Sequence, residues 1–125
     1  MATAAVTVDF TMQSHDLLPS IQATLKNPDG SIVDLTSATS VKFILLAANT
    51  DWTPANGASP TVSSAAVIVA PATSGVVRYD WAVGDTATAG QYLGQWQVTW
   101  PTNRPQSFPT ATYYAIQILA DLDGA

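Results

Sequence analysis

Hydrophobic and polar residues alternate with a period of two in several short stretches of this chain, and turn residues separate the stretches. Such alternation predicts half-buried β-strands, whereas helical periodicity is nearly absent. The clearest stretch is residues 90–100, where Tyr92, Trp96 and Trp100 fall on one face. Because large aromatics dominate the energetics of protein cores, we expect this strand to lie at the centre of the core.

Further strands are expected on either side of this one. The turn at residues 27–30 contains Pro28, which presets φ, and Gly30, which tolerates positive φ, so a hairpin should follow it. The far end of residues 41–48 is apolar on both faces and should therefore be covered on both sides. Residues 49–61 and 101–109 have no periodicity and are expected to be long surface loops. The other expected strands cover residues 6–12, 20–26, 31–35, 41–48, 62–70, 75–81 and 112–120.

The segment from Asp85 to Tyr92 indicates how the strands are arranged. It resembles the corner of immunoglobulin sandwiches, in which a tyrosine near the start of the penultimate strand hydrogen-bonds to the backbone just before it. The sequence therefore predicts an all-β fold, an immunoglobulin-like antiparallel β-sandwich of about seven strands. No composition shift, linker or repeat divides the chain, so residues 1–125 are expected to form a single domain.

Charge is scarce, and this changes which functions are open to the chain. Charged residues make up 10% of it, there is no Glu, and the net charge is −5. Four scattered bases do not form the cluster that phosphate binding needs, so no nucleic-acid partner is expected. Nothing suggests a signal peptide or an apolar run of about 20 residues, so no membrane partner is expected either. A surface rich in Thr, Ser, Asn and Gln leaves much uncharged area for contact with neighbours.

Catalytic chemistry has few candidate residues. His15 is the single histidine and cysteine is absent, so neither a cysteine-based triad nor the usual zinc ligand set can be assembled. Asp29, Asp51, Asp80 and Asp85 could supply a glycosidase pair, although isolated Asp residues at turns more often cap local backbone amides. We expect no catalytic residues and no enzyme.

Cofactor and metal sites are not expected. Residues 121–124 resemble a fragment of a calcium loop but lack the later ligands. The chain has no phosphate-binding loop and no dinucleotide fingerprint.

Four residues in the two expected loops are candidates for an interface. Trp52 and Asn56 lie in the first loop, and Arg104 and Phe108 lie in the second. Exposed aromatics and arginines are frequent anchors of protein interfaces. Two alternatives remain for Trp52: its ring folds back over the base of its own loop, or it contributes to a sugar-stacking platform.

Four segments carry a family resemblance by their order and spacing: Phe10 to Leu46 with His15-Asp16 and Pro19, Gly75 to Trp81, Asp85-Thr86, and Ala89 to Trp96. Through them most of the chain resembles the N-terminal immunoglobulin-like domain of phage baseplate upper proteins and related receptor-binding tail proteins. This family usually has Gly where this chain has His15 and usually continues into a further C-terminal part. The resemblance implies an adaptor domain that anchors to a virion and carries no active site.

The leading functional hypothesis is accordingly a structural protein of a tailed-phage virion, assembled in the host cytoplasm. It would act as an adaptor or decoration domain that docks onto tail, baseplate, collar or capsid proteins, as a homo-oligomer in a symmetric assembly. The alternative is a carbohydrate-binding domain that attaches the virion to a host glycan. A small glycosidase is the third hypothesis.

Overall fold

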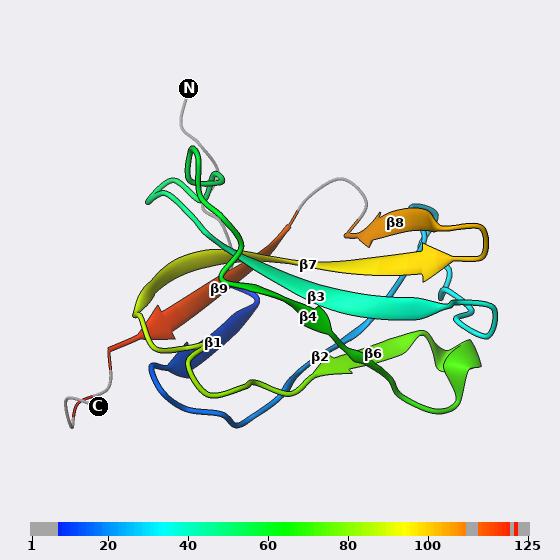
Figure 1. Cartoon of the computed structure of the whole chain (residues 1–125), viewed down its shortest axis with the longest axis horizontal. Coiled ribbons are helices and arrows are strands. Elements are labelled where there is room, and N and C mark those ends of the chain that lie inside the picture. Colours follow the sequence, from blue (N-terminus) through cyan, green and yellow to red (C-terminus); the bar gives the residue numbers. More distant parts are fainter. Residues whose placement is uncertain (1–7, 110–112, 121, 123–125) are drawn as a thin grey trace.

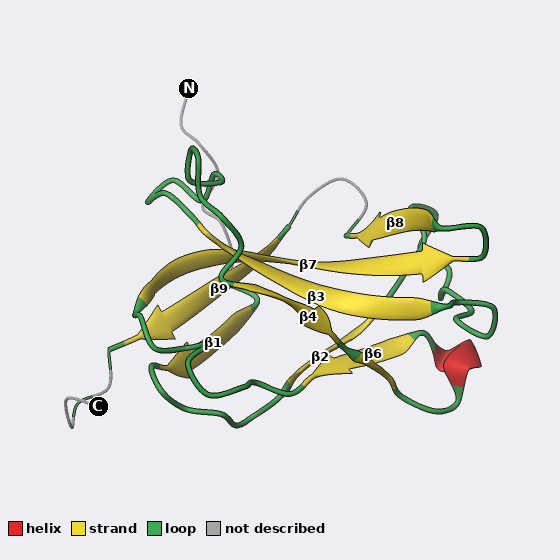
Figure 2. Ribbon diagram, viewed as in Figure 1, coloured by secondary structure: helices red, strands yellow, loops and turns green. Residues whose placement is uncertain are grey.

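Short β-strands make up nearly all the regular structure in the computed structural model, which describes residues 8–109, 113–120 and 122 (Figures 1 and 2). One 3-10 turn, Ala72–Ser74, interrupts them. Three positions of the expected strands lie outside the described residues: 6, 7 and 112. So does the segment that resembles a calcium loop, residues 121–124, apart from residue 122. The strands are β1 (Phe10–Gln13), β2 (Ile21–Thr24), β3 (Ser40–Ala47), β4 (Val62–Ala65), β5 (Val67–Ile68), β6 (Val76–Tyr79), β7 (Gly90–Trp100), β8 (Arg104–Phe108) and β9 (Tyr114–Leu119).

The strands form two sheets packed as a sandwich, so the all-β prediction is confirmed. The larger sheet has the order β1-β9-β7-β3-β4, with β8 also paired to β7, and the smaller sheet has the order β2-β6-β5. With β2 to β7 lettered B, C, C′, D, E and F, the sheets contain B-E-D and C′-C-F, which is the immunoglobulin arrangement. The sandwich is not entirely antiparallel, because β1 runs parallel to β9 with Phe10 opposite Ile116.

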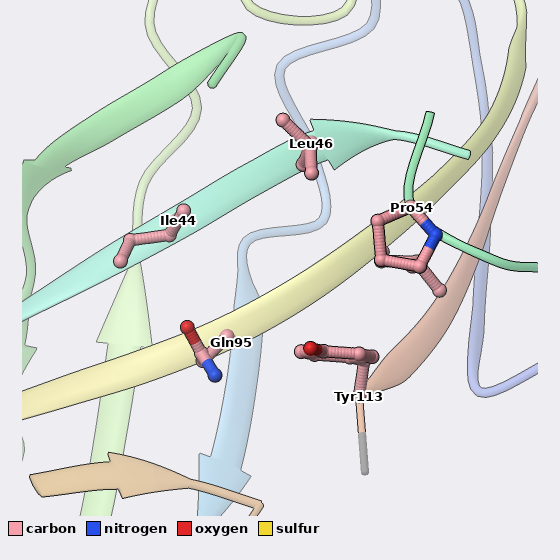
Figure 3. A pocket seen from close by; sticks show the side chains of 6 residues that line it. Ile44, Leu46, Pro54, Gln95 and Tyr113 are labelled. Carbon is pink, nitrogen blue, oxygen red and sulfur yellow. The ribbon is translucent and has the colours of Figure 1, made fainter. Parts of the chain in front are cut away.

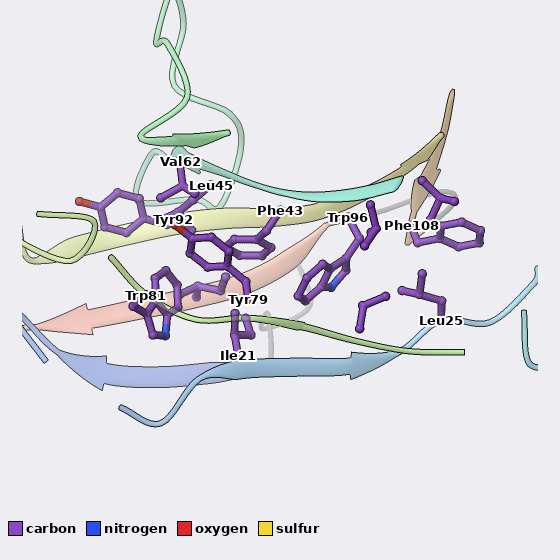
Figure 4. Packing of buried hydrophobic residues seen from close by; sticks show 14 of the residues in the cluster. Ile21, Leu25, Phe43, Leu45, Val62, Tyr79, Trp81, Tyr92, Trp96 and Phe108 are labelled. Atoms are coloured by element: carbon purple, nitrogen blue, oxygen red, sulfur yellow. The ribbon is translucent and has the colours of Figure 1, made fainter. Parts of the chain in front are cut away.

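Alternation along β7 builds the core as expected. Tyr92, Gly94, Trp96 and Val98 are all buried, and Trp96 is 0% exposed. The ring centroid of Phe43 on β3 lies 4.8 Å from that of Trp96. The Phe43 ring also contacts Tyr79, the last residue of β6, and Trp81, two residues further on. The centroid distances are 5.3 Å and 5.7 Å, so aromatic contacts join the two layers (Figure 4).

The predicted corner is present. The hydroxyl of Tyr92 donates a hydrogen bond of 2.7 Å to the backbone oxygen of Thr88. Trp81 is fixed similarly, because its indole N–H donates to the backbone oxygen of Pro19 at 3.1 Å. The indole N–H of Trp96 has no hydrogen-bond partner among the described residues. Packing therefore holds the indole of Trp96 in the core, while its backbone is fixed by the pairing of β7 with β3 and β8.

The turn at residues 27–30 forms, and the hairpin expected after it is reduced to a short pair of arms: the Asn27 N–H donates to the Ser31 oxygen at 2.8 Å and the Val33 N–H to the Leu25 oxygen at 3.0 Å. Gly30 donates its N–H to the oxygen of Asn27 at 2.9 Å and has a φ of 90°. Beyond the turn, a single bridge between Lys26 and Ile32 replaces the strand expected at residues 31–35. Val33 nevertheless points into the core and is 5% exposed. Alternation here reflects burial of an irregular segment and not a sheet.

The strand expected at residues 62–70 is two strands in different sheets. β4 pairs with β3 in the larger sheet, and β5 pairs with β6 in the smaller sheet. The chain changes sheets at Ala66, whose N–H donates to the oxygen of Val41 at 2.9 Å. Residues 62–70 contain no Gly or Pro that would mark this change of sheet in the sequence.

Residues 101–109 were expected to form a loop, and this prediction is wrong for most of the segment. β8 pairs with the second half of β7, while β9 pairs with the first half. Together they supply one interrupted strand beside β7. Pro105 is tolerated because edge strands can accept a residue that donates no hydrogen bond.

Candidate docking face

The outer face of the larger sheet is formed by the residues that alternate with the core residues. On β3 these are Lys42, Ile44 and Leu46, which lie opposite Gln97, Gln95 and Leu93 on β7. Lys42 is the single charged residue at an outward-facing position of the described strands of this sheet. We call this surface the outer face. It combines an apolar centre with uncharged polar surroundings.

A hollow of about 230 Å³ lies in the outer face, at the end toward Ala47 (Figure 3). Leu93 is 6% exposed at its base, whereas Tyr113 at its rim is 46% exposed. We expected the far end of residues 41–48 to be covered on both sides. The inner side is covered by the core, but on the outer side Ile44 and Leu46 stay only half-buried. The lining residues are Ile44, Leu46, Pro54, Leu93, Gln95 and Tyr113.

The loop after β3 forms a wall at one end of the hollow. It extends from the larger sheet on the side away from β2 and β6 (Figure 1). A bridge between Ala48 and Pro54 ties its base to the strand end. The N–H of Asn49 donates to the oxygen of Thr53 at 2.8 Å, and the Asn49 side-chain amide donates to the Thr53 hydroxyl oxygen at 3.0 Å. These bonds make the wall a defined feature and not a loose loop.

Trp52 lies at the tip of this wall and is half-buried. Its φ of 64° is in the left-handed region, which a bulky side chain rarely adopts. The turn holds it there, because the N–H of Trp52 donates to the oxygen of Asn49 at 2.9 Å. Beside it, the Thr53 hydroxyl donates to Asp51 at 2.6 Å and lowers the pKa of that exposed carboxyl. The indole is thus neither fully buried under its loop nor fully exposed to solvent.

The other three predicted interface residues differ in their surroundings. Asn56 is exposed in the same loop, and Arg104 is exposed at the start of β8. The prediction for Phe108 is wrong, because its side chain is 1% exposed. Phe108 lies opposite Trp96 on the inward side of the sheet, so its ring belongs to the core.

The candidate catalytic carboxylates are each engaged in local hydrogen bonds. Asp80 accepts hydrogen bonds from the Ser20 hydroxyl at 2.6 Å and from Arg78 at 3.1 Å, and these contacts lower its pKa. Asp85 accepts bonds from the Tyr79 hydroxyl and the Ala82 N–H. Burial, followed by the contact with Asp85, raises the pKa of Tyr79 to about 12.

Asp29 and Asp51 each accept hydrogen bonds from a Ser or Thr two residues ahead. His15 is exposed and adopts a φ of 69°, which is consistent with a turn residue. Within residues 8–109, 113–120 and 122, no group of three or more His or Asp side chains is placed to hold a metal ion. Nor does a helix long and apolar enough to cross a membrane occur in that part of the chain.

Sequence reasoning missed two features of the surface. The sequence places Tyr113 in the expected strand 112–120 and does not mark it as a surface contact; it lies just before β9 and reaches the hollow only through the pairing of β9 with β7. The second feature is a group of exposed apolar residues: Leu18 is 76% exposed and Val83 is 90% exposed. Their two loops lie side by side, since the Thr86 hydroxyl donates to the oxygen of Asp16 at 2.9 Å.

The fold and this surface define the class of the protein as an all-β sandwich domain with an uncharged, hollowed outer face. Neither a known protein family, nor a curated protein, nor a solved structure significantly matches the chain.

Proposed function

We propose that this chain is a docking module that binds another protein through the outer face of its larger sheet. The observation that carries the proposal is the open hollow between β3 and β7. Half-buried Ile44 and Leu46 lie there in a sheet whose inner face is already packed. An antiparallel sheet with one solvated face usually presents polar residues on that face. A partner that covers the hollow would remove this apolar surface from water.

The size and lining of the hollow favour a protein partner over a small ligand. Its volume of about 230 Å³ is below the range of roughly 300–1,000 Å³ for ligand pockets. Of the strand residues that line the hollow, Gln95 is polar and the others are apolar. Few polar groups are therefore available to orient a small molecule. An apolar or long side chain of another protein fits a shallow hollow of this kind, as anchors do in protein interfaces.

Within this function, we propose that the partners are structural proteins of a tailed-phage virion. The support is the resemblance to phage baseplate upper and receptor-binding tail proteins, together with a surface that carries little charge. Charged residues make up 10% of the chain, so symmetric neighbours can pack with little desolvation of charge. The chain would then be an adaptor or decoration domain on a tail, baseplate, collar or capsid.

A host glycan is the second candidate partner. Tyr113 is 46% exposed and lines the hollow together with Gln95, so an aromatic ring and an amide lie at one site. A glycan array probed at high protein concentration tests this candidate. Binding that disappears in Tyr113→Ala would favour it, and an array without any binder would remove it.

Mass spectrometry of purified particles tests the virion proposal. Particles are released from the host that carries this gene, purified through two successive density gradients, and compared with a mock lysate taken through the same steps. We expect peptides of this chain to co-purify with the major capsid and tail proteins at a constant ratio across the gradient. Absence of the chain from mature particles would sink the proposal.

A further inference from the structure

We propose that the outer face takes a second copy of this chain, in a symmetric pair whose two β3 strands run in opposite directions across the interface. The proposal rests on the docking function above and names the occupant of the hollow. Its basis is the distribution of charge around the outer face.

The described strands of the outer face carry no acidic residue. With a net charge of −5, two copies repel each other over most of their surfaces. In the described part of the chain, no Asp lies within any strand of the larger sheet, so β3 and β7 of two outer faces can meet without opposing carboxylates. Asp9 lies at the β1 edge, where its carboxylate accepts a hydrogen bond from the Ala115 N–H at 2.8 Å. The described acids all lie in loops or turns: Asp9, Asp16, Asp29, Asp34, Asp51, Asp80 and Asp85.

The two ends of the outer face carry opposite charges. Lys42 lies at one end. Among the described residues, a salt bridge joins Arg78 to Asp80, and Lys42 makes none. Asp51 lies beyond the other end, in the wall whose Pro54 lines the hollow. Lys42 and Leu46 are four residues apart on β3, which is about 13 Å at 3.3 Å per residue. The hollow therefore lies between the lysine and the acidic wall.

Symmetry then selects one arrangement. When two outer faces pack through a twofold axis that lies in the interface and crosses the strands, the Lys42 end of each copy meets the wall of the other. The aliphatic stem of Lys42 would cover the partner's hollow, and its ammonium would reach the partner's Asp51. An axis parallel to the strands would instead place Lys42 over uncharged neighbours such as Gln97, its opposite residue on β7. The first arrangement forms two ion pairs and also uses the apolar hollow.

Sedimentation velocity of the purified chain, from micromolar to near-millimolar concentration at low salt, tests the pairing. We expect a concentration-dependent dimer. Lys42→Glu and Asp51→Lys should each weaken it by about tenfold, as for other close interfacial charge pairs, and the double variant should recover most of the loss. Asp51→Asn retains an oxygen acceptor for Thr53, so it separates the charge from the shape of the wall. It should weaken the dimer while the circular dichroism spectrum is unchanged.

The control exchanges Arg78 and Asp80 on the smaller sheet, and this exchange should leave the dimer intact. A chain that stays monomeric at near-millimolar concentration overturns the pairing, and so does a double variant no tighter than the single ones. Failure of the pairing is distinguishable from failure of the docking function. A monomeric chain still found in purified particles contradicts only the pairing, whereas a dimer absent from particles contradicts the virion role.

Discussion

The outer faces of the two sheets differ in chemistry although both belong to one sandwich. On the smaller sheet, Gln22, Arg78 and Val67 lie side by side in one row across β2, β6 and β5. Arg78 is paired with Asp80, with side chains 38% and 58% exposed, as is usual for a solvated sheet surface. On the larger sheet, the row at the hollow pairs Leu46 with Leu93.

This difference locates the function. Folding requires apolar residues on the inner faces only, and both sheets meet that requirement with the same buried cluster. Apolar residues on one outer face contribute less to folding because solvent still reaches them. We therefore attribute them to contact with a partner, and substitutions that separate the two outer faces test this attribution.

The largest expected effect comes from a charge placed in the hollow. Leu46→Asp should weaken incorporation into particles by at least about tenfold, because a carboxylate at an apolar contact must be desolvated without a partner. Its counterpart on the other sheet is Val67→Asp, at a residue that is 43% exposed, and this variant should incorporate normally. The measurement is quantitative mass spectrometry of particles after complementation with each variant. Equal incorporation of the two variants would contradict the proposed location.

A smaller effect separates docking from stability. Tyr113→Ala should weaken docking severalfold and leave the melting temperature nearly unchanged, because the ring is 46% exposed in the free chain. Tyr92→Phe should do the opposite. It removes the corner hydrogen bond to Thr88 and should lower the free energy of unfolding by about 1 kcal/mol without affecting docking. Denaturant unfolding and a binding assay on the same two proteins check this crossed pattern.

The smallest effect lies on the smaller sheet. Ser20→Ala removes the contact that does most to lower the pKa of Asp80, so that pKa should rise toward the ordinary value of 3.8. The pKa of Asp80 is lower in the folded chain than in the unfolded chain, so the ionised carboxylate stabilises the fold at pH values above the unfolded-state pKa. This stabilisation is lost as pH falls through the folded-state pKa. Titration by NMR of the Asp80 carboxyl carbon measures the shift. Docking at neutral pH should not change. A loss of docking would indicate that the outer face of the smaller sheet contacts the partner.

The fold was predictable where a single signal was strong. The bounds of β7 follow from its alternation, and the hydrogen bond of Tyr92 follows from the corner pattern. β8 was missed because its five residues include Pro105, and a proline-rich segment of this length is ordinarily a loop. The change of sheet at Ala66 was missed because alternation shows which side of a strand is buried, not which sheet it joins.

The candidate face was only partly predictable. The apolar character of both sides of β3 indicated that Ile44 and Leu46 need cover, but the sequence alone did not show that the cover is missing. The hollow also depends on Tyr113, which comes close only through the pairing of β7 with β9. The proline-rich sequence around Phe108 predicts an exposed loop, whereas the pairing of Phe108 with Trp96 places its ring inside. Contacts between distant segments therefore decided the site.

Side-chain footprinting of free and particle-bound protein shows which outer face is covered in the assembly. Carbene labelling reports the solvent exposure of apolar side chains, so both outer faces can be followed in one experiment. We expect labelling of Ile44, Leu46 and Tyr113 to fall strongly in the assembly, relative to the dilute monomer, while labelling of Val67 does not change. Protection of Val67 with continued labelling of the hollow would contradict this expectation.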